Sequence, residues 1–235
     1  MNKYEFKYLI INAKYKTKYE VIIDINNNEI YGYEALSTFE IDKEIINTEE
    51  IFRQLHHNNE LFFDLEKRNK QLQIKNFEFH KKLFLNFDAD IFITEEQKEF
   101  WENFLTNNRK DIVVEITENG SDDESSSKSM RDFSFWLKQM NINAALDDFG
   151  QEGSMFSFFI MNNSQYIKID KSFIKQIRAN KNYIHYLKGL LLTIQVNNKK
   201  SIIEGIETKE DLELAKKLGC DYVQGYYFKD YNIIR

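Results

Sequence analysis

The sequence predicts an α/β fold in which parallel strands close into a modified TIM-like (β/α)8 barrel. Short apolar segments alternate with segments of helical spacing along most of the chain, which is typical of a parallel sheet covered by helices. The length of 235 residues suits a single barrel. We therefore expect one domain that spans residues 1–235.

The predicted strands share a polar residue at or near their carboxyl ends. In chain order they cover residues 32–36, 83–86, 112–115, 143–150, 166–170, 201–205 and 221–225. In a barrel of this kind, polar residues at the carboxyl ends of the strands face one common mouth. Seven polar strand ends are thus predicted to meet in one pocket.

The predicted helices between these strands carry apolar residues at three- and four-residue spacing. They cover residues 48–69, 95–106, 125–140, 180–197 and 209–218. We find no linker and no internal repeat, which agrees with a single domain.

Two adjacent carboxylates, Asp147 and Asp148, end an apolar strand and are followed by Gly150. Successive side chains of a strand point to opposite faces, so both carboxylates reach one site only where the strand breaks into a loop. Glycine tolerates the backbone angles that such a break requires. The pair is either a cation site or an Asp-rich turn, and the other polar strand ends favour the cation site.

The chain resembles the EAL-domain family of cyclic di-GMP phosphodiesterases in seven segments, over almost its entire length. They read G-Y-E-A-L at 32–36, L-F-L-N-F around Asn86, V-E-I-T-E at 114–118, A-L-D-D-F-G at 145–150, I-K-I-D-K-S-F-I at 167–174, I-E-G-I-E-T at 203–208 and L-G-C-D-Y-V-Q-G-Y-Y-F at 218–228. One such match is weak, whereas seven in order are specific. The resemblance implies the modified barrel and hydrolysis of cyclic di-GMP to linear pGpG.

The resemblance also implies a site for two divalent cations. Glu34, Asn86, Glu115 and Asp147 would hold one cation, and Asp147 would bridge to a second cation held with Asp148. These side chains offer only oxygen ligands, which suit Mg²⁺ or Mn²⁺. Two such ions neutralise phosphoryl charge and activate water.

Three further residues receive catalytic roles, Lys168 from its place in a buried strand and Glu204 and Glu118 from the resemblance. Lys168 would orient the attacking water; the alternative is an exposed lysine on an edge strand. Glu204 would act either as a base or as a metal ligand through water. Glu118 would brace the loop after the aspartates, or it is simply an acid at a helix N-terminus.

Substrate contacts are expected from Gln224, Leu36, Thr38 and Glu20, and two of these positions depart from the family. An arginine that grips a substrate phosphate usually stands at the position of Thr38, and an amide usually stands at that of Glu20. Loss of the guanidinium removes a bidentate contact. The loop at residues 151–154 differs as well, since the family usually has T-G-Y-S there.

Composition limits the partners and the compartment. The net charge of −6 gives no general attraction to DNA or RNA, so we expect no nucleic-acid polymer as a partner. The resemblance implies cyclic di-GMP as the partner. A single cysteine, Cys220, excludes an internal disulfide, and no membrane span or secretion signal is found, so a cytoplasmic location is predicted. The aromatic-rich residues 155–160 predict a homodimer, the alternative being that they pack on the barrel.

The leading hypothesis is a metal-dependent phosphodiesterase that hydrolyses cyclic di-GMP. The eroded substrate contacts motivate a rival, a catalytically impaired receptor that binds cyclic di-GMP intact. An interaction scaffold that binds neither nucleotide nor metal is the third alternative.

Overall fold

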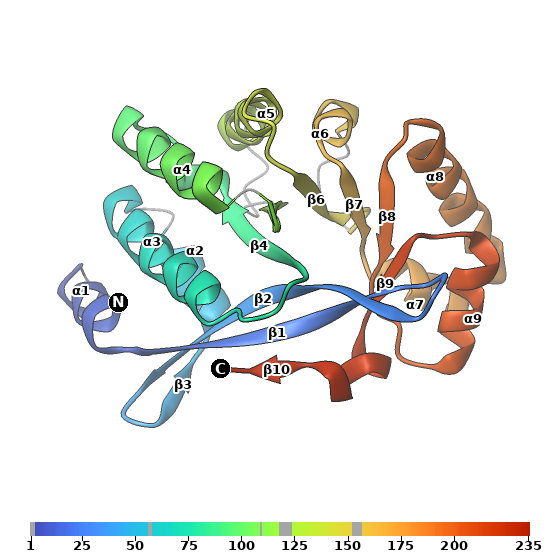
Figure 1. Cartoon of the computed structure of the whole chain (residues 1–235), viewed down its shortest axis with the longest axis horizontal. Helices are drawn as coiled ribbons and strands as arrows, with labels where there is room; N and C mark the ends of the chain where they lie inside the picture. Colours follow the sequence, from blue (N-terminus) through green and yellow to red (C-terminus); the bar gives the residue numbers. More distant parts are fainter. Residues whose placement is uncertain (1–2, 56–57, 109, 118–123, 152–156) are drawn as a thin grey trace.

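Eight strands close into a barrel in the computed structural model of the chain, which describes residues 3–55, 58–108, 110–117, 124–151 and 157–235. The barrel closes because the first strand pairs with both the second and the ninth. The predicted (β/α)8 barrel is therefore confirmed (Figure 1). In order around the barrel the strands are β1 (Lys14–Asp24), β2 (Glu29–Ile41), β4 (Lys82–Asp88), β5 (Ile112–Thr117), β6 (Ala144–Phe149), β7 (Tyr166–Ile169), β8 (Lys200–Ile203) and β9 (Tyr222–Gln224).

Strand β1 runs against the rest of the barrel. It pairs antiparallel with β2 and β9, whereas the neighbouring pairs from β2 to β9 are parallel. Figure 1 shows β1 and β2 as a long two-stranded ribbon, which is extended by β3 (Glu44–Ile46) and β10 (Ile233–Ile234). Strand β1 was not expected from the sequence.

The helices cover the outside of the barrel (Figure 1). They are α1 (Lys3–Asn12), α2 (Thr48–Leu55), α3 (Asn59–Lys75), α4 (Glu95–Asn108), α5 (Glu124–Gln139), α6 (Phe158–Asn163), α7 (Ser172–Ala179), α8 (Ile184–Val196) and α9 (Lys209–Leu218), with short 3₁₀ helices at Ala89–Ile91, Lys181–Tyr183 and Tyr226–Tyr231. The single helix predicted at 48–69 is wrong. A new helix begins there because Asn58 acts as an N-cap, its side chain accepting a hydrogen bond from Leu61 N at 3.3 Å.

Alternation along each strand sorts side chains into two apolar clusters. On β5, Val114 and Ile116 join the large cluster under the helices, whereas Val113 lies in a smaller cluster inside the barrel. The buried side chains of the large cluster supply most of the stability, at about 1.5–3 kcal/mol for each fully buried large apolar residue. The same alternation places Glu115 inside the barrel with Val113, as the sequence predicts.

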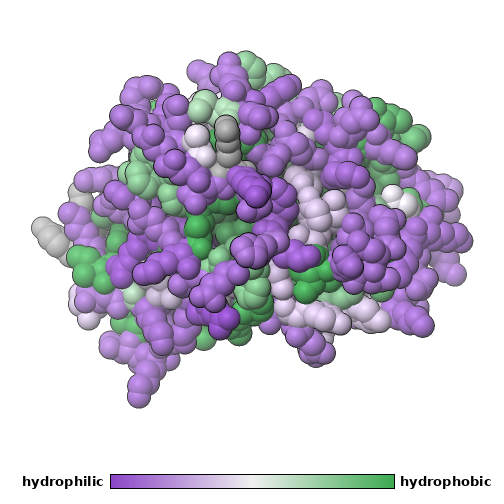
Figure 2. Space-filling view, in the orientation of Figure 1, coloured by the Kyte–Doolittle hydropathy of each residue, from purple (hydrophilic) through white to green (hydrophobic). Residues whose placement is uncertain are grey.

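The outer surface is mainly hydrophilic. Figure 2 shows polar residues over most of one face, with scattered apolar side chains between them. In the part of the chain that the structure describes, no helix combines the length and the apolar character needed to cross a membrane.

Candidate active site

Four carboxylates surround one buried lysine at the carboxyl ends of the strands. Lys168 Nζ lies 3.2 Å from Glu34 Oε2, 2.9 Å from Glu115 Oε1, 2.8 Å from Asp147 Oδ1 and 2.9 Å from Glu204 Oε1. The lysine side chain is 1% exposed, so it is not the exposed edge residue that was the alternative. Strands β2, β5, β6 and β7 and the residue after β8 thus bring together five predicted site residues.

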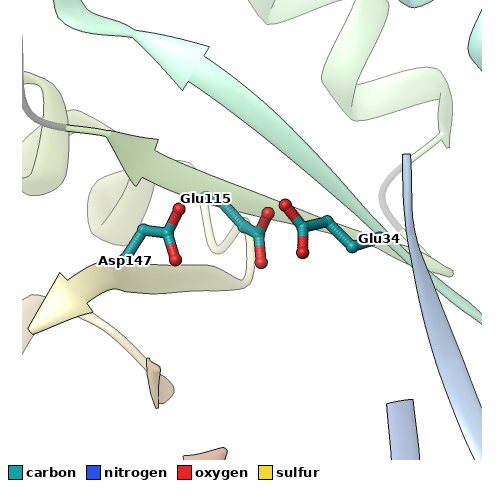
Figure 3. A group of neighbouring side chains, drawn as sticks. All are labelled: Glu34, Glu115 and Asp147. Carbon is teal, nitrogen blue, oxygen red and sulfur yellow. The ribbon is translucent and has the colours of Figure 1, made fainter. Parts of the chain in front are cut away.

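Figure 3 shows the carboxylates of Glu34, Glu115 and Asp147 pointing toward one another from three strands. One oxygen from each lies within 4.8 Å of the others. A second group with the same property consists of Asp147, Asp148 and Glu204. Asp147 belongs to both groups, so the two groups share one carboxylate.

The two aspartates reach the same site because strand β6 breaks where they stand. The pairing of β6 with β7 shifts register between Leu146 and Phe149. Asp148 has φ 47° and Gly150 φ 85°, which take the chain out of the extended conformation. A side chain at Gly150 would also clash, since a Cβ there would lie 2.3 Å from the Phe173 ring. The predicted break in the strand is confirmed.

Two amide side chains hold Glu34 in place. Asn86 Nδ2 donates to Glu34 Oε1 at 2.9 Å, and Gln224 Nε2 donates to Glu34 Oε2 at 2.7 Å. Both amides therefore lie beside the first acidic group. Their remaining oxygens offer neutral ligands or contacts to a substrate.

Burial and mutual repulsion shift the protonation of this cluster. Burial raises the pKa of Glu115 well above its usual range, with the charges of Glu34 and Asp147 adding to it. Burial raises the pKa of Asp148 to about 7, the Asp147 charge contributing. Burial likewise raises the pKa of Glu204 to about 8, although Lys168 opposes this. Such shifts occur where acidic groups are gathered for a function.

Two members of the cluster keep their charge. Burial alone would lower the pKa of Lys168, but the carboxylates of Asp147, Glu115, Glu204 and Glu34 raise it well above its usual range. Burial alone would raise the pKa of Glu34, yet the Lys168 charge and the hydrogen bonds from the two amides lower it.

The residues fit a divalent cation because one ammonium faces four carboxylates. Glu115 Oε2 is buried with no hydrogen-bond partner among the described residues, while Glu115 Oε1 and Asp147 Oδ1 share the single ammonium of Lys168 with two other carboxylates. Buried polar atoms are normally satisfied, so an unpaired oxygen of this kind is suited to ligand binding. Their oxygen character matches Mg²⁺ or Mn²⁺.

The remaining predicted site residues divide into three cases. Gln224 is buried beside Glu34. Glu20, Leu36 and Thr38 are half-buried on β1 and β2. Glu118 lies outside the described residues, as do residues 152–154 of the altered loop.

Strand β1, which closes the barrel between β2 and β9, was not expected from the sequence. The signal was present, because residues 14–21 alternate between charged and apolar or small side chains with a period of two. That alternation places Lys16 and Lys18 on the same face as Glu20.

Comparison with known proteins decides the family. The sequence profile described as "EAL domain" matches residues 5–230. The chain belongs to the EAL-domain family. Cyclic di-GMP phosphodiesterase TpdA of Vibrio parahaemolyticus is 24% identical to this EAL-family chain over 221 residues, which cover 94% of the chain and 38% of TpdA.

Two solved structures have the same fold. The FimX EAL domain from Pseudomonas aeruginosa bound to c-di-GMP has a TM-score of 0.77 at 22% identity, covering 92% of this chain and 89% of that one. The Bacillus subtilis YkuI protein in complex with c-di-GMP and calcium also has a TM-score of 0.77, at 21% identity, covering 97% and 58%. Across the first four curated relatives, this EAL-family chain spans between 12% and 53% of their length.

Proposed function

We propose that this EAL-family chain is a divalent-metal-dependent phosphodiesterase that hydrolyses cyclic di-GMP to linear pGpG. The observation that carries the proposal is the position of Asp147, which belongs to two acidic groups that both lie against Lys168. That arrangement matches the chemical need, because phosphodiester hydrolysis requires charge neutralisation on the phosphoryl oxygens and a nucleophile made from water. The relative TpdA carries the name of this activity.

Five side chains of the acidic cluster and its neighbours would hold the two cations. Glu34, Asn86, Glu115 and Asp147 would hold one Mg²⁺ or Mn²⁺, and Asp147 with Asp148 would hold the other. When bound, the two cations supply Lewis acidity and lower the pKa of water. A water oxygen attacks phosphorus while the bond to the 3′-oxygen breaks, and the proton lost by the water balances the one gained by the 3′-oxygen.

Lys168 and Glu204 orient the attacking water in this proposal. Their contact at 2.9 Å joins an ammonium, which stabilises charge on the phosphoryl oxygens, to a carboxyl group that can take a proton at its oxygen. Gln224, Leu36, Thr38 and Glu20 would contact the nucleotide. We also propose that residues 1–235 act as one such domain, that Glu118 braces the loop after Asp148, and that the chain forms a homodimer in the cytoplasm.

Turnover of cyclic di-GMP by the purified protein with Mn²⁺ or Mg²⁺ tests the proposal. Chromatography should show conversion to pGpG, and Glu34→Gln should lower the rate by at least about a hundredfold, because it removes a ligand from a preorganised site. Glu29→Gln is the matched control, since Glu29 begins the same strand and is exposed. Absence of conversion at every metal and nucleotide concentration would contradict the enzyme hypothesis.

Thr38 and Glu20 favour the second candidate, a cyclic di-GMP receptor. An arginine is expected at the first position and an amide at the second. Calorimetry followed by chromatography of the same sample separates the two functions. Binding with all nucleotide recovered intact selects the receptor, whereas conversion selects the enzyme.

A further inference from the structure

The ribbon formed by β1 and β2 carries two lysines, one directly across from the position that lacks the family's phosphate contact and one two residues closer to the acidic cluster. In the antiparallel register, Lys16 stands opposite Thr38, Lys18 opposite Leu36 and Glu20 opposite Glu34. Residues that stand directly opposite in an antiparallel pair share a face, with their Cβ atoms about 4.5–5.5 Å apart. Lys16 is therefore the cross-strand neighbour of Thr38, which stands where the family usually has an arginine.

Both lysines lie on the face of the ribbon that also carries the acidic cluster. Tyr19 and Val21 of β1 belong to the large apolar cluster outside the barrel, whereas Ile22 belongs to the cluster inside it. The register between β1 and β2 shifts only after Ile22, so the alternation is unbroken through Lys16 and Lys18. Their side chains share the inner face with Glu34.

The lysines are held by contacts that a phosphate can replace. Lys18 Nζ lies 2.6 Å from Glu20 Oε2, and Lys16 pairs with Glu40. Lys16 and Lys18 side chains are 33% and 42% exposed. Ion pairs that reach solvent contribute little to stability, and both pairs are partly exposed, so either ammonium can turn toward an incoming anion.

The site needs such cations because its buried lysine is already engaged. Lys168 contacts four carboxylates, and the whole chain carries a net charge of −6. A cyclic dinucleotide has two phosphodiesters, and while one lies at the acidic cluster the other must be neutralised nearby. At about 3.3 Å per residue, Thr38 lies about 13 Å along β2 from Glu34 and Leu36 about half as far.

We propose that Lys16 and Lys18 bind a phosphate group of the cyclic dinucleotide substrate, in place of an arginine at position 38. This inference rests on the proposed function. It makes the two lysines substrate-binding residues that act on affinity and leave the chemical step to the acidic cluster.

The double variant Lys16→Gln/Lys18→Gln tests this assignment. Calorimetry with cyclic di-GMP and Ca²⁺ should show a dissociation constant raised by about tenfold to a hundredfold, since charge-assisted hydrogen bonds are lost. With Mn²⁺, KM should rise and kcat should change by less than about twofold. Lys14→Gln is the matched control, because Lys14 is exposed on the same face of the same strand, one step farther from the cluster, and should bind normally.

Adding Thr38→Arg to the double variant provides the positive test. A guanidinium placed across from position 16 should restore most of the lost affinity, which a merely structural role of the lysines would not allow. If the wild-type protein binds no cyclic di-GMP, both this inference and the proposed function fail. If the wild type binds and the double variant binds equally well, or if Thr38→Arg restores nothing, only the lysine assignment is overturned.

Discussion

The two ends of the barrel interior are built by the same strands and differ in how well their polar atoms are satisfied. Near the starts of the strands, Phe84, Tyr166 and Tyr222 pack with aliphatic side chains. There Tyr31 stacks on Tyr222 with ring centroids 4.0 Å apart, and its hydroxyl hydrogen-bonds to that of Tyr166.

At the other end, two residues further along the same strands, the side chains are charged or carry an amide. Tyr166 is followed on its face by Lys168, and Val113 by Glu115. There Glu115 Oε2 is buried with no hydrogen-bond partner among the described residues, and four carboxylates share one ammonium. The contrast teaches that one end of the barrel stabilises the fold, while the other keeps a buried acidic cluster at a cost in stability, which is the arrangement our proposed function requires.

Among the variants that test this contrast, Lys168→Met should have the largest effect on turnover and stability. Without the ammonium, turnover should fall by about a hundredfold to a thousandfold. The metal-free protein should lose about 3–5 kcal/mol in its free energy of unfolding, because buried carboxylates lose their partner. Urea denaturation with a chelator and turnover with Mn²⁺ measure the two effects.

Lys200→Met is the control for that variant at the opposite end. Lys200 pairs with Asp221 at 2.6 Å, but its side chain is 54% exposed. The variant's free energy of unfolding should therefore fall by only about 0–1 kcal/mol. An equal loss in both variants would contradict the contrast.

Phe84→Ala should damage stability and spare the chemistry. Its ring is fully buried inside the barrel and packs against Tyr166 with centroids 5.3 Å apart. Truncation should lower the free energy of unfolding by about 3–5 kcal/mol, while turnover per folded molecule stays within about twofold. Urea denaturation and turnover rates corrected for the fraction of folded protein provide the check. Phe84→Leu should lower the free energy of unfolding by less than Phe84→Ala does. A large fall in turnover of folded Phe84→Ala protein would show that the two ends are not separable.

Divalent cations should stabilise the folded protein through the acidic end alone. At a Mn²⁺ concentration one hundred times its dissociation constant, the free energy of unfolding should rise by about 2.7 kcal/mol. The rise should be lost in Asp147→Asn, which removes the shared ligand, and kept in Phe84→Ala. Thermal unfolding with Mn²⁺ and with chelator measures it, and an unchanged response in Asp147→Asn would place the bound ion elsewhere.

The smallest effect is expected from Tyr31→Phe. It removes one hydroxyl from the Tyr31–Tyr166 hydrogen bond and keeps the stacked ring. The free energy of unfolding should therefore fall by about 1 kcal/mol. Turnover should not change. Urea denaturation resolves a change of this size, and a loss of turnover here would show that the aromatic end shapes the acidic one.

Much of the fold could be predicted from local sequence signals. The seven polar strand ends were recognisable because buried parallel strands are short apolar runs with polar termini. The break after Leu146 was predicted from the paired aspartates and Gly150, and it is present as a register shift.

The rest depended on contacts that no single segment contains. The antiparallel direction of β1 follows from its pairing with both β2 and β9, which are about 200 residues apart in the chain. The helix predicted at 48–69 divides at Asn58 because a side-chain cap outweighs continuous helical spacing. The contact of Lys168 with four carboxylates required the closed barrel, since the strands that carry them meet only there. The role of Glu118 and the homodimer remain predictions.

The central claim is that carboxylates from separate strands gather around paired divalent cations, and anomalous diffraction from crystals soaked in Mn²⁺ tests it most directly. We expect two anomalous peaks that share Asp147, one bounded by Glu34 and Glu115 and the other by Asp148. Peaks only at other sites, or none at the acidic cluster at saturating Mn²⁺, would contradict it.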